Sequence, residues 1–445
     1  MSYRHYSVGI YTLGCKVNQY ESEAIAEKFA ALGFQIIPPT KACDIYVINT
    51  CTVTAESDRK ARQFIRRAIH HNPRAYILVT GCLSQTNPAQ IELIGGVDYI
   101  CGNAQKLAVV DAACALIAKG EKNLRPTVTA IAPDACGFEK MTITKFDRTR
   151  AYVKIEDGCE SHCTYCIIPS ARGSIRSKPL DDVLSEVRTL TENGCREIVL
   201  TGIETASYGK DLDGVTLADL LCEIDKIPNI GRIRLGSLDP SLIKQSFVDR
   251  IAGLKSLTPH FHLSMQSGSD TVLSLMKRKY NTKMALEAMD RLRKVLPNVQ
   301  FTTDMIVGFP NETQEDFEKT LEFVHRARFL MIHVFPYSKR EGTPAAIMEG
   351  QISEKIKHER VAILSNESAK IRKEILDCKT DTVDEVLFET YENGTMRGHT
   401  PNFIEVQCPT PCPLHARTLS VRIEGNDGER CFGIIQNETD YGKDL

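Results

Sequence analysis

The sequence predicts an α/β protein with three parts: an N-terminal domain on a parallel sheet, an incomplete (β/α)6 barrel, and a small all-β barrel. Through most of the chain, short apolar runs alternate with amphipathic helical segments, a pattern typical of parallel sheets covered by helices. After Leu376 the pattern changes to short strands separated by Asn-Gly and Asn-Asp-Gly turns, which indicates a small β-barrel. The length of 445 residues leaves room for these three parts.

The N-terminal domain is predicted over residues 1–120. Strands are expected at 7–14, 45–51 and 76–82, and helices follow the first two strands at 21–32 and 56–71. A mixed, proline-containing stretch, 121–144, is interpreted as a linker. Three cysteines come at the ends of the predicted strands: Cys15, Cys51 and Cys82. Because the carboxyl ends of strands in open α/β sheets lie along one ligand-binding edge, these cysteines can converge in space.

The barrel is predicted over residues 145–376 and the C-terminal β-barrel over 377–445. Six barrel strands are expected before a closing helical stretch, at 151–157, 196–202, 232–238, 260–266, 299–308 and 330–338. Six units are too few for a complete barrel, which has eight units and needs about 250 residues. The barrel is therefore expected to be open.

Composition excludes several classes of protein. Fifty-five Lys and Arg against 57 Asp and Glu give a net charge of −2, so overall charge does not indicate a nucleic-acid partner. No apolar stretch approaches the roughly 18 residues of a membrane span, and the N-terminus lacks the pattern of a secretory signal. We therefore expect a cytoplasmic protein with no membrane partner. Sixteen cysteines in a reducing compartment indicate metal or redox chemistry where their spacing suits it.

The densest cysteine group follows the first barrel strand. Cys159, Cys163 and Cys166 stand in the segment GCESHCTYC, and three thiolates on a short loop can hold an iron–sulfur cluster by three corners. A four-iron cluster would then keep one iron open for a ligand. The alternatives are a zinc site or a chance grouping, but structural zinc sites usually take four ligands.

This motif resembles that of the radical S-adenosylmethionine (SAM) superfamily. The resemblance implies a [4Fe–4S] cluster on Cys159, Cys163 and Cys166 whose open iron binds SAM and cleaves it to a 5′-deoxyadenosyl radical. Tyr165 matches the aromatic residue that lies near the adenine of SAM, although loop packing alone would also account for it.

The N-terminal cysteines resemble those of the methylthiotransferases within that superfamily. The matching segments are YTLGCKVNQYESE, INTCTVT and VTGCLSQ, and the resemblance implies a second [4Fe–4S] cluster on Cys15, Cys51 and Cys82. It covers nearly the whole chain, including a C-terminal barrel like the TRAM domain of tRNA-modifying enzymes. The segments LGCKVNQYES, LTGIETASYG, HFHLSMQSGSDTVLSLMKRKY and HVFPYSKREGTPAA look like the bacterial branch that acts on N6-threonylcarbamoyladenosine in tRNA.

The chemistry implied by this family needs no general acid–base dyad, because the C2–H bond of adenine is strong and not acidic and the cofactor carries the difficult step. One SAM would donate its methyl group to a sulfur on the auxiliary cluster, and a second would yield the radical that activates C2. The implied partners are tRNA and an electron donor such as flavodoxin or ferredoxin. Residues at strand ends are candidates to bind SAM or to cap strands: Gly202, Glu204, Ser237, Gln266, Thr303 and Asp304.

RNA contacts are harder to place from the sequence. The segment 56–74 predicts a basic amphipathic helix on which Arg62, Arg66 and Arg67 meet phosphates or simply face solvent. MKRKY at 276–280 is a second basic cluster. The C-terminal domain carries six Lys and Arg against thirteen Asp and Glu from Leu376 onward, so only a local patch around Arg397 is a candidate RNA contact there.

Two other hypotheses stay open. The same radical chemistry could act on isopentenyladenosine in tRNA or on an aspartate of a ribosomal protein. A non-catalytic iron–sulfur protein that binds RNA or senses redox state would predict no 5′-deoxyadenosine when SAM and a reductant are supplied.

Overall fold

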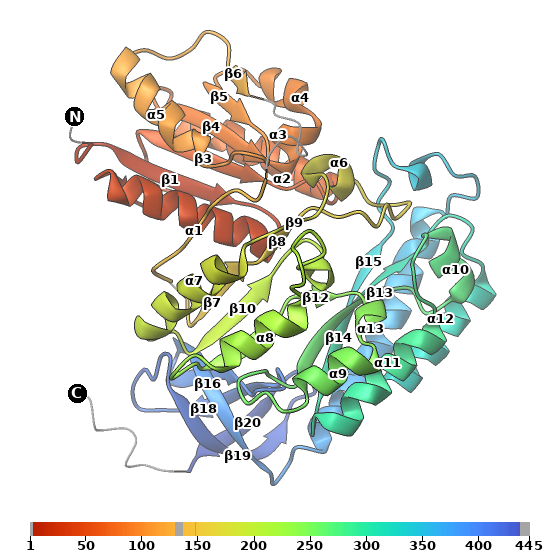
Figure 1. Cartoon of the computed structure of the whole chain (residues 1–445). Coiled ribbons are helices and arrows are strands. Elements are labelled where there is room, and N and C mark those ends of the chain that lie inside the picture. Colours follow the sequence, from red (N-terminus) through yellow and green to blue (C-terminus); the bar gives the residue numbers. More distant parts are fainter. Residues whose placement is uncertain (1–2, 130–136, 147, 437–445) are drawn as a thin grey trace.

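The computed structural model describes residues 3–129, 137–146 and 148–436, and it has the three parts that the sequence predicts (Figure 1). The N-terminal part, in red and orange, lies at the top of the view. The open barrel occupies the middle, and the blue C-terminal barrel lies at the bottom. The order of the parts along the chain is thus also their order in space.

The N-terminal part is a six-stranded parallel sheet with strand order β2-β1-β3-β4-β5-β6. Its strands are β1 (Ser7–Thr12), β2 (Gln35–Ile36), β3 (Ile45–Thr50), β4 (Tyr76–Gly81), β5 (Tyr99–Cys101) and β6 (Thr127–Thr129). Its helices are α1 (Lys16–Ala31), α2 (Ala55–His71), α3 (Cys82–Thr86), α4 (Pro88–Glu92) and α5 (Ala108–Lys119). Apolar residues of α1 and α5 pack on one face and those of α2 on the other.

Two expectations for this part need correction. Strand β6 lies inside the stretch 121–144 that the sequence indicates as a linker, because its three residues pair with β5 and complete the sheet. Helix α1 begins at Lys16 rather than at residue 21, directly after Cys15. Asn18 and Glu21 are therefore helical, and both are fully buried.

The middle part is an open parallel barrel made of two sheets, β11-β10-β7 and β12-β13-β14-β15. The strands are β7 (Arg150–Lys154), β10 (Glu197–Thr201), β11 (Arg232–Leu235), β12 (Ser237–Leu238), β13 (His260–Gln266), β14 (Gln300–Val307) and β15 (Met331–Pro336). The strand predicted over 232–238 is thus broken at Gly236, where the two sheets part. A short antiparallel pair, β8 (Glu156–Asp157) and β9 (Arg176–Ser177), flanks the cysteine loop.

Helices cover the outside of this barrel. They are α7 (Leu180–Glu192), α8 (Leu217–Asp225), α9 (Gln245–Ile251), α10 (Asp270–Leu275), α11 (Thr282–Val295), α12 (Gln314–Ala327) and α13 (Glu354–Asp377). The short α6 (Ile168–Arg172) instead follows the cysteine loop and packs against α3 of the N-terminal part. Short 3₁₀ turns stand at η2 (Thr205–Ser207), η3 (Pro240–Leu242) and η4 (Pro344–Ala346). The predicted closing helix is α13, whose first turn is capped by the Ser353 side chain accepting from the Ile356 N–H at 3.5 Å.

The C-terminal part is a closed barrel of five strands in the order β16-β17-β18-β20-β19. They are β16 (Val383–Glu392), β17 (Thr395–His399), β18 (Glu405–Pro409), β19 (Thr418–Asn426) and β20 (Cys431–Ile435). Buried and exposed residues alternate along β19 and β20, as strands with one face toward a core require. One continuous apolar core runs from Tyr20 on α1 through the open barrel to Val386 on β16 and so joins the three parts.

Candidate active site

The first cysteine set lies where three adjacent strands of the N-terminal sheet end. Strands β1, β3 and β4 are neighbours, and the registers Thr12 with Asn49 and Thr50 with Gly81 bring their carboxyl ends level. The next residues are cysteines: Cys15 caps α1, Cys51 follows β3 and Cys82 opens α3.

Two glycines make room for these turns. A Cβ on Gly14 would stand 2.8 Å from the Cys51 Sγ, which places this sulfur against the residue before Cys15. Gly81 has φ of +104°, and a Cβ there would come within 2.3 Å of the Thr50 carbonyl oxygen. Any other residue at either position would push the cysteine turns apart.

The thiols of this set influence one another. Burial raises the pKa of the Cys51 thiol to about 11, and the neighbouring Cys82 and Cys15 add to that rise. Burial also raises the pKa of Cys15, whereas the charge of Arg172 opposes the rise. Burial therefore disfavours a bare thiolate at Cys51 and Cys15, and a metal centre bound there would supply the positive charge that a thiolate ligand requires.

The second set stands on the loop between β8 and α6. The Ser161 N–H donates to the Cys159 Sγ at 3.4 Å, and the Arg278 Nη1 donates to the Cys163 Sγ at 3.0 Å. Hydrogen bonds to ligand sulfurs are among the features that tune iron–sulfur clusters. Burial raises the pKa of the Cys166 thiol to about 11, and Cys163 together with Cys82 of the first set adds to that rise.

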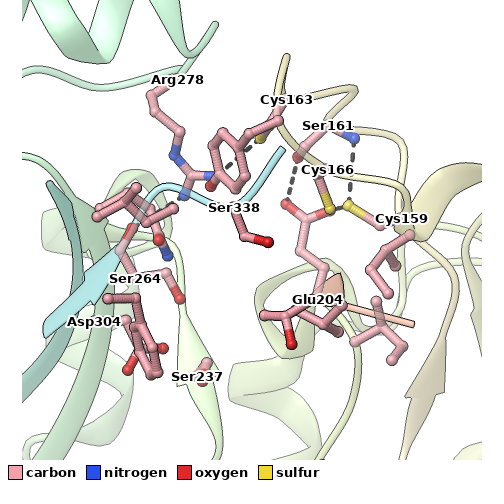
Figure 2. Close-up of a pocket in the computed structure, with 18 of the residues that line it drawn as sticks. Cys159, Ser161, Cys163, Cys166, Glu204, Ser237, Ser264, Arg278, Asp304 and Ser338 are labelled. Atoms are coloured by element: carbon pink, nitrogen blue, oxygen red, sulfur yellow. Dashed lines mark hydrogen bonds between the residues drawn. The ribbon is translucent and has the colours of Figure 1, made fainter. Parts of the chain in front are cut away.

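A cavity of about 360 Å³ opens beside this second set (Figure 2). It holds residues from the cysteine loop, from the ends of β12 to β15 and from the segment after Cys51. The polar lining residues include Thr54, Ser161, Glu204, Ser237, Asp239, Ser264, Gln266, Arg278, Asp304 and Ser338. Apolar walls come from Val53, Tyr165, Ile168, Ile203, Ile306, Phe335, Pro336 and Tyr337. Both the N-terminal part and the barrel therefore contribute to one cavity.

Glu204 and Arg278 place opposite charges on two sides of the cysteine loop. Figure 2 shows the Glu204 carboxylate turned toward Ser161 and Cys159, and its oxygens lie 3.0 Å from the Ser161 Oγ and 3.4 Å from the Cys159 Sγ. Arg278 approaches Cys163 from the other side and pairs with Asp239 at 3.2 Å. Local sequence missed Arg278, because its segment, MKRKY, was interpreted as a basic surface cluster; in fact the side chain points into the cavity.

The strand-end residues named from the sequence divide into two groups. Tyr165, Glu204, Ser237, Gln266 and Asp304 all line the cavity. Gln266 does so with a left-handed backbone, φ +64°, at a bulge in β13. Burial opposes ionisation of Asp304, but the hydrogen bond and charge of His262, with His333 and Lys16, outweigh it and lower its pKa.

Thr303 and Gly202 do not line the cavity. The Thr303 hydroxyl is fully buried and donates to the Leu263 carbonyl at 2.6 Å, so it ties β14 to β13. Gly202 leaves space for the buried side chain of Glu156. A Cβ added at Gly202 would stand only 2.6 Å from a carboxylate oxygen of Glu156. The contacts of Thr303 and Gly202 are thus structural. A position at a strand end is compatible with such a role as well as with SAM binding.

Among the described residues, no three His, Cys, Asp or Glu side chains stand close enough together to enclose a single metal ion. A four-iron cluster differs from a single ion, since each thiolate binds its own iron and the ligands stand farther apart.

Comparisons with known proteins agree with this geometry. A model described as "Radical SAM superfamily" matches residues 153–324, and one described as "Uncharacterized protein family UPF0004" matches residues 7–102. The threonylcarbamoyladenosine tRNA methylthiotransferase MtaB of Bacillus subtilis is 41% identical over 90% of both chains. This chain belongs to the radical SAM methylthiotransferase family. It is an enzyme of the transferase class, and its cofactors are SAM and [4Fe–4S] clusters.

This methylthiotransferase is also similar to a second kind of tRNA-modifying enzyme in sequence and to a radical SAM methyltransferase in structure. A tRNA-2-methylthio-N(6)-dimethylallyladenosine synthase of Acetivibrio thermocellus is 35% identical, with 85% of this chain and 79% of that protein covered. The solved structure of the radical SAM methyltransferase TsrM from Kitasatospora setae has a TM-score of 0.57 at 16% identity, covering 78% and 77% of the two chains. That structural similarity supports the fold alone.

The methylthiotransferase's C-terminal barrel uses part of its acidic charge to dock on the open barrel. The Glu389 carboxylate pairs with Arg150 and accepts from the His399 Nδ1 at 2.7 Å. Arg232 donates to the carbonyl oxygens of His399 at 2.9 Å and Glu385 at 3.1 Å. One acidic side chain of this part, Glu389, thus has a basic partner on the neighbouring barrel, and Arg232 binds its backbone.

The arginines predicted to contact RNA lie on two parts of the chain, three on α2 and one on β17. On α2, Arg66 and Arg67 are exposed, whereas Arg62 donates to the Gln90 side chain at 2.9 Å. Arg397 is half-buried on β17, in the C-terminal barrel. In the part of the chain that the structure describes, no helix is long and apolar enough to cross a membrane.

Proposed function

We propose that this methylthiotransferase inserts a methylthio group at C2 of N6-threonylcarbamoyladenosine, the modified adenosine next to the anticodon of tRNA. The observation that carries the proposal is a cavity lined by Cys159, Cys163 and Cys166 and also by Val53 and Thr54, which follow Cys51 of the other three-cysteine set. The substrate follows from the relative of that name, which is more similar to this chain than the relative named for dimethylallyladenosine, at 41% against 35% identity. Such an enzyme would work in the cytoplasm, with flavodoxin or ferredoxin as its electron donor.

Within this proposal, Cys159, Cys163 and Cys166 hold the cluster that binds SAM, and Cys15, Cys51 and Cys82 hold the auxiliary cluster. When bound, these cofactors supply a radical for the C2–H bond and the sulfur that replaces its hydrogen. The protein's own residues position and shield the reactants. No pair of side chains has to act as general acid and base.

The charges around the second cysteine set complement the amino-acid end of SAM. The Glu204 carboxylate is placed to accept from its ammonium group, and the Arg278 guanidinium to donate to its carboxylate. Ser237, Gln266 and Asp304 supply polar groups farther along the same cavity. Tyr165 lies edge-on to Phe309, with ring centroids 6.5 Å apart, and offers an aromatic wall to the adenine.

The cavity mouth suits a nucleobase. Phe335 lines the cavity yet keeps 47% of its surface exposed. Stacking on aromatic side chains is a common way to hold an unstacked base. We therefore place the substrate adenine against Phe335.

A basic groove next to the cavity suits the RNA backbone. The groove has a volume of about 650 Å³ and shares Glu204 and Asp239 with the cavity. Its charged lining residues are Lys210, Lys244, Arg250 and Lys279 together with Glu204, Asp219 and Asp239. Arg250 pairs with Asp219 at 2.7 Å, whereas within the described ranges no carboxylate lies at ion-pair distance from Lys244 or Lys279. Free cations beside a cavity are the usual partners of phosphates.

Replacing Lys244 and Lys279 with Gln should raise the KM for tRNA and weaken the salt dependence of binding. Loss of two phosphate contacts lowers the slope of log Kd against log salt by about 1.4. The matched control replaces Lys294 and Lys319, which are exposed on α11 and α12 and lie outside the groove. Filter binding from 50 to 200 mM salt is the measurement; equal slopes for both double variants would exclude the groove.

The decisive test of the function is nucleoside mass spectrometry. We would compare tRNA from cells lacking their own methylthiotransferases, with and without this gene. The expected result is the appearance of 2-methylthio-N6-threonylcarbamoyladenosine. Appearance of the methylthio isopentenyl nucleoside would keep the reaction and overturn the substrate. No new nucleoside, with both clusters loaded, would overturn the tRNA substrate altogether.

A further inference from the structure

A buried network of charges lies between the two cysteine sets. Arg172, the last residue of α6, is fully buried together with Glu21 and Asn18 of α1, and Asp157 is almost fully buried beside them. Helix α6 carries the chain on from Cys166 and packs against α3, which Cys82 opens (Figure 1). The network is thus within a few residues of every cysteine loop.

On one side, Arg172 reaches the loops of the first cysteine set through Asn18. The Arg172 Nη2 donates to the Asn18 Oδ1 at 2.6 Å. The amide nitrogen of Asn18 donates in turn to the Leu13 carbonyl at 2.7 Å and to the Thr50 carbonyl at 3.0 Å. Leu13 lies two residues before Cys15 and Thr50 directly precedes Cys51, so one side chain fixes both turns.

On the other side, Arg172 reaches the loop of the second set. The Arg172 Nη1 donates to the Asp157 Oδ1 at 2.9 Å, and the same carboxylate oxygen accepts from the Gly158 N–H at 2.9 Å. The carbonyl of Gly173, the next residue after Arg172, accepts from the Cys159 N–H at 3.0 Å. Both bonds set the backbone directly before Cys159.

An ordinary docking contact would not need this arrangement. Buried ion pairs cost desolvation, and well-packed apolar residues often hold a boundary as well or better. Arg172 also donates to the Glu21 carboxylate at 2.9 Å. Its bonds to Asn18 and Asp157, however, lead to backbone groups within two residues of a cysteine. Arginine suits this task because its planar fork donates in several fixed directions at once.

We propose that Arg172 is a positioning residue that couples the two cysteine loops and so sets the separation and orientation of the two clusters. The proposal rests on the proposed function, since it assumes that both cysteine sets carry a cluster. Its consequence is that transfer between the two sites depends on Arg172 more strongly than SAM cleavage at one of them.

The test compares Arg172→Lys with a matched variant, Arg360→Lys. Arg360 is also buried, pairs with Glu312 at 2.8 Å and donates to two backbone carbonyls, but it lies between α13 and the loop before α12, where no cysteine of either set stands. Both variants keep the positive charge and lose the planar guanidinium group, which donates in several fixed directions. The readouts are the magnetic interaction between the two reduced clusters in electron paramagnetic resonance spectra, and the methylthio product formed per 5′-deoxyadenosine.

We expect Arg172→Lys to change the spin–spin splitting and to lower the product per 5′-deoxyadenosine by about tenfold to a hundredfold, since misplacement near 1 Å has effects of that size. Arg360→Lys should leave both readouts at the wild-type values. If Arg172→Lys does not fold, Asn18→Asp is measured in its place. This replacement keeps an oxygen that accepts from Arg172, but it removes the hydrogen bonds that the Asn18 amide donates to the carbonyls of Leu13 and Thr50. A wild-type splitting and a wild-type product ratio in the variant that folds would overturn the coupling by Arg172. Absence of clusters or of product in the wild-type protein would instead overturn the proposed function.

Discussion

Replacing Cys159, Cys163 and Cys166 together with Ala is expected to reduce SAM cleavage to the level of a protein-free control. The thiols hold the cofactor that carries the chemistry, and the remaining cavity residues offer no alternative route to a radical. Iron in the reconstituted protein should fall from about eight to about four atoms per chain, because one of two four-iron clusters is lost. Iron analysis and chromatography of 5′-deoxyadenosine are the measurements.

Two control variants make this result specific. The matched triple replacement of Cys15, Cys51 and Cys82 should lose the same amount of iron, still form 5′-deoxyadenosine and yield no methylthio product. Cys378→Ala removes an exposed cysteine far along the chain from both sets and should change nothing. Cleavage of SAM by the first triple variant would show that the cavity cysteines do not hold the radical cluster.

Much of the fold follows from hydrophobic periodicity. The strand expected at 260–266 agrees with β13, and most others agree within two residues at each end. The strands of the N-terminal part that the sequence did not predict are short: β2 has two residues, and β5 and β6 have three each. Such strands form because a neighbouring strand offers hydrogen bonds, which local sequence does not record.

The candidate site could be predicted only as far as its motifs. The six cysteines stand out by their spacing and by their places after strands. The lining residues Ser264 and Phe335 come from strands far apart in sequence, and their meeting depends on the curvature of the open barrel. The buried charges were missed for another reason: Glu21 and Arg172 look like ordinary surface residues until a second part of the chain covers them.

Replacing Glu21 with Gln is expected to destabilise the protein by about 3–5 kcal/mol, because removal of one partner leaves buried cations without compensation. Glu21 pairs with Arg172 at 2.9 Å, with Lys154 at 2.8 Å and with Lys106. After the replacement these three cations share the single carboxylate of Asp157 and the amide oxygens nearby. The midpoint of urea unfolding of the cluster-free protein should fall by about 1 M or more.

The same network should make stability depend on pH. Burial opposes the ionisation of Glu21, but Arg172, Lys106 and Lys154 outweigh it and hold its pKa well below the usual value. A carboxyl with a lowered pKa in the folded state stabilises the fold fully above its unfolded pKa of about 4.3, and this contribution is lost as the pH falls toward the folded pKa. The wild-type midpoint should therefore fall more steeply below about pH 4.5 than the midpoint of Glu21→Gln.

An exposed pair provides the control for both measurements. Glu56 accepts from Arg59 on the surface of α2, in the same part of the chain, and solvent screens this interaction. Glu56→Gln should leave the urea midpoint unchanged at pH 7. A midpoint for Glu21→Gln that matches Glu56→Gln would mean that the buried cations find other partners or water, and that the junction between the two cysteine-bearing parts does not depend on this carboxylate.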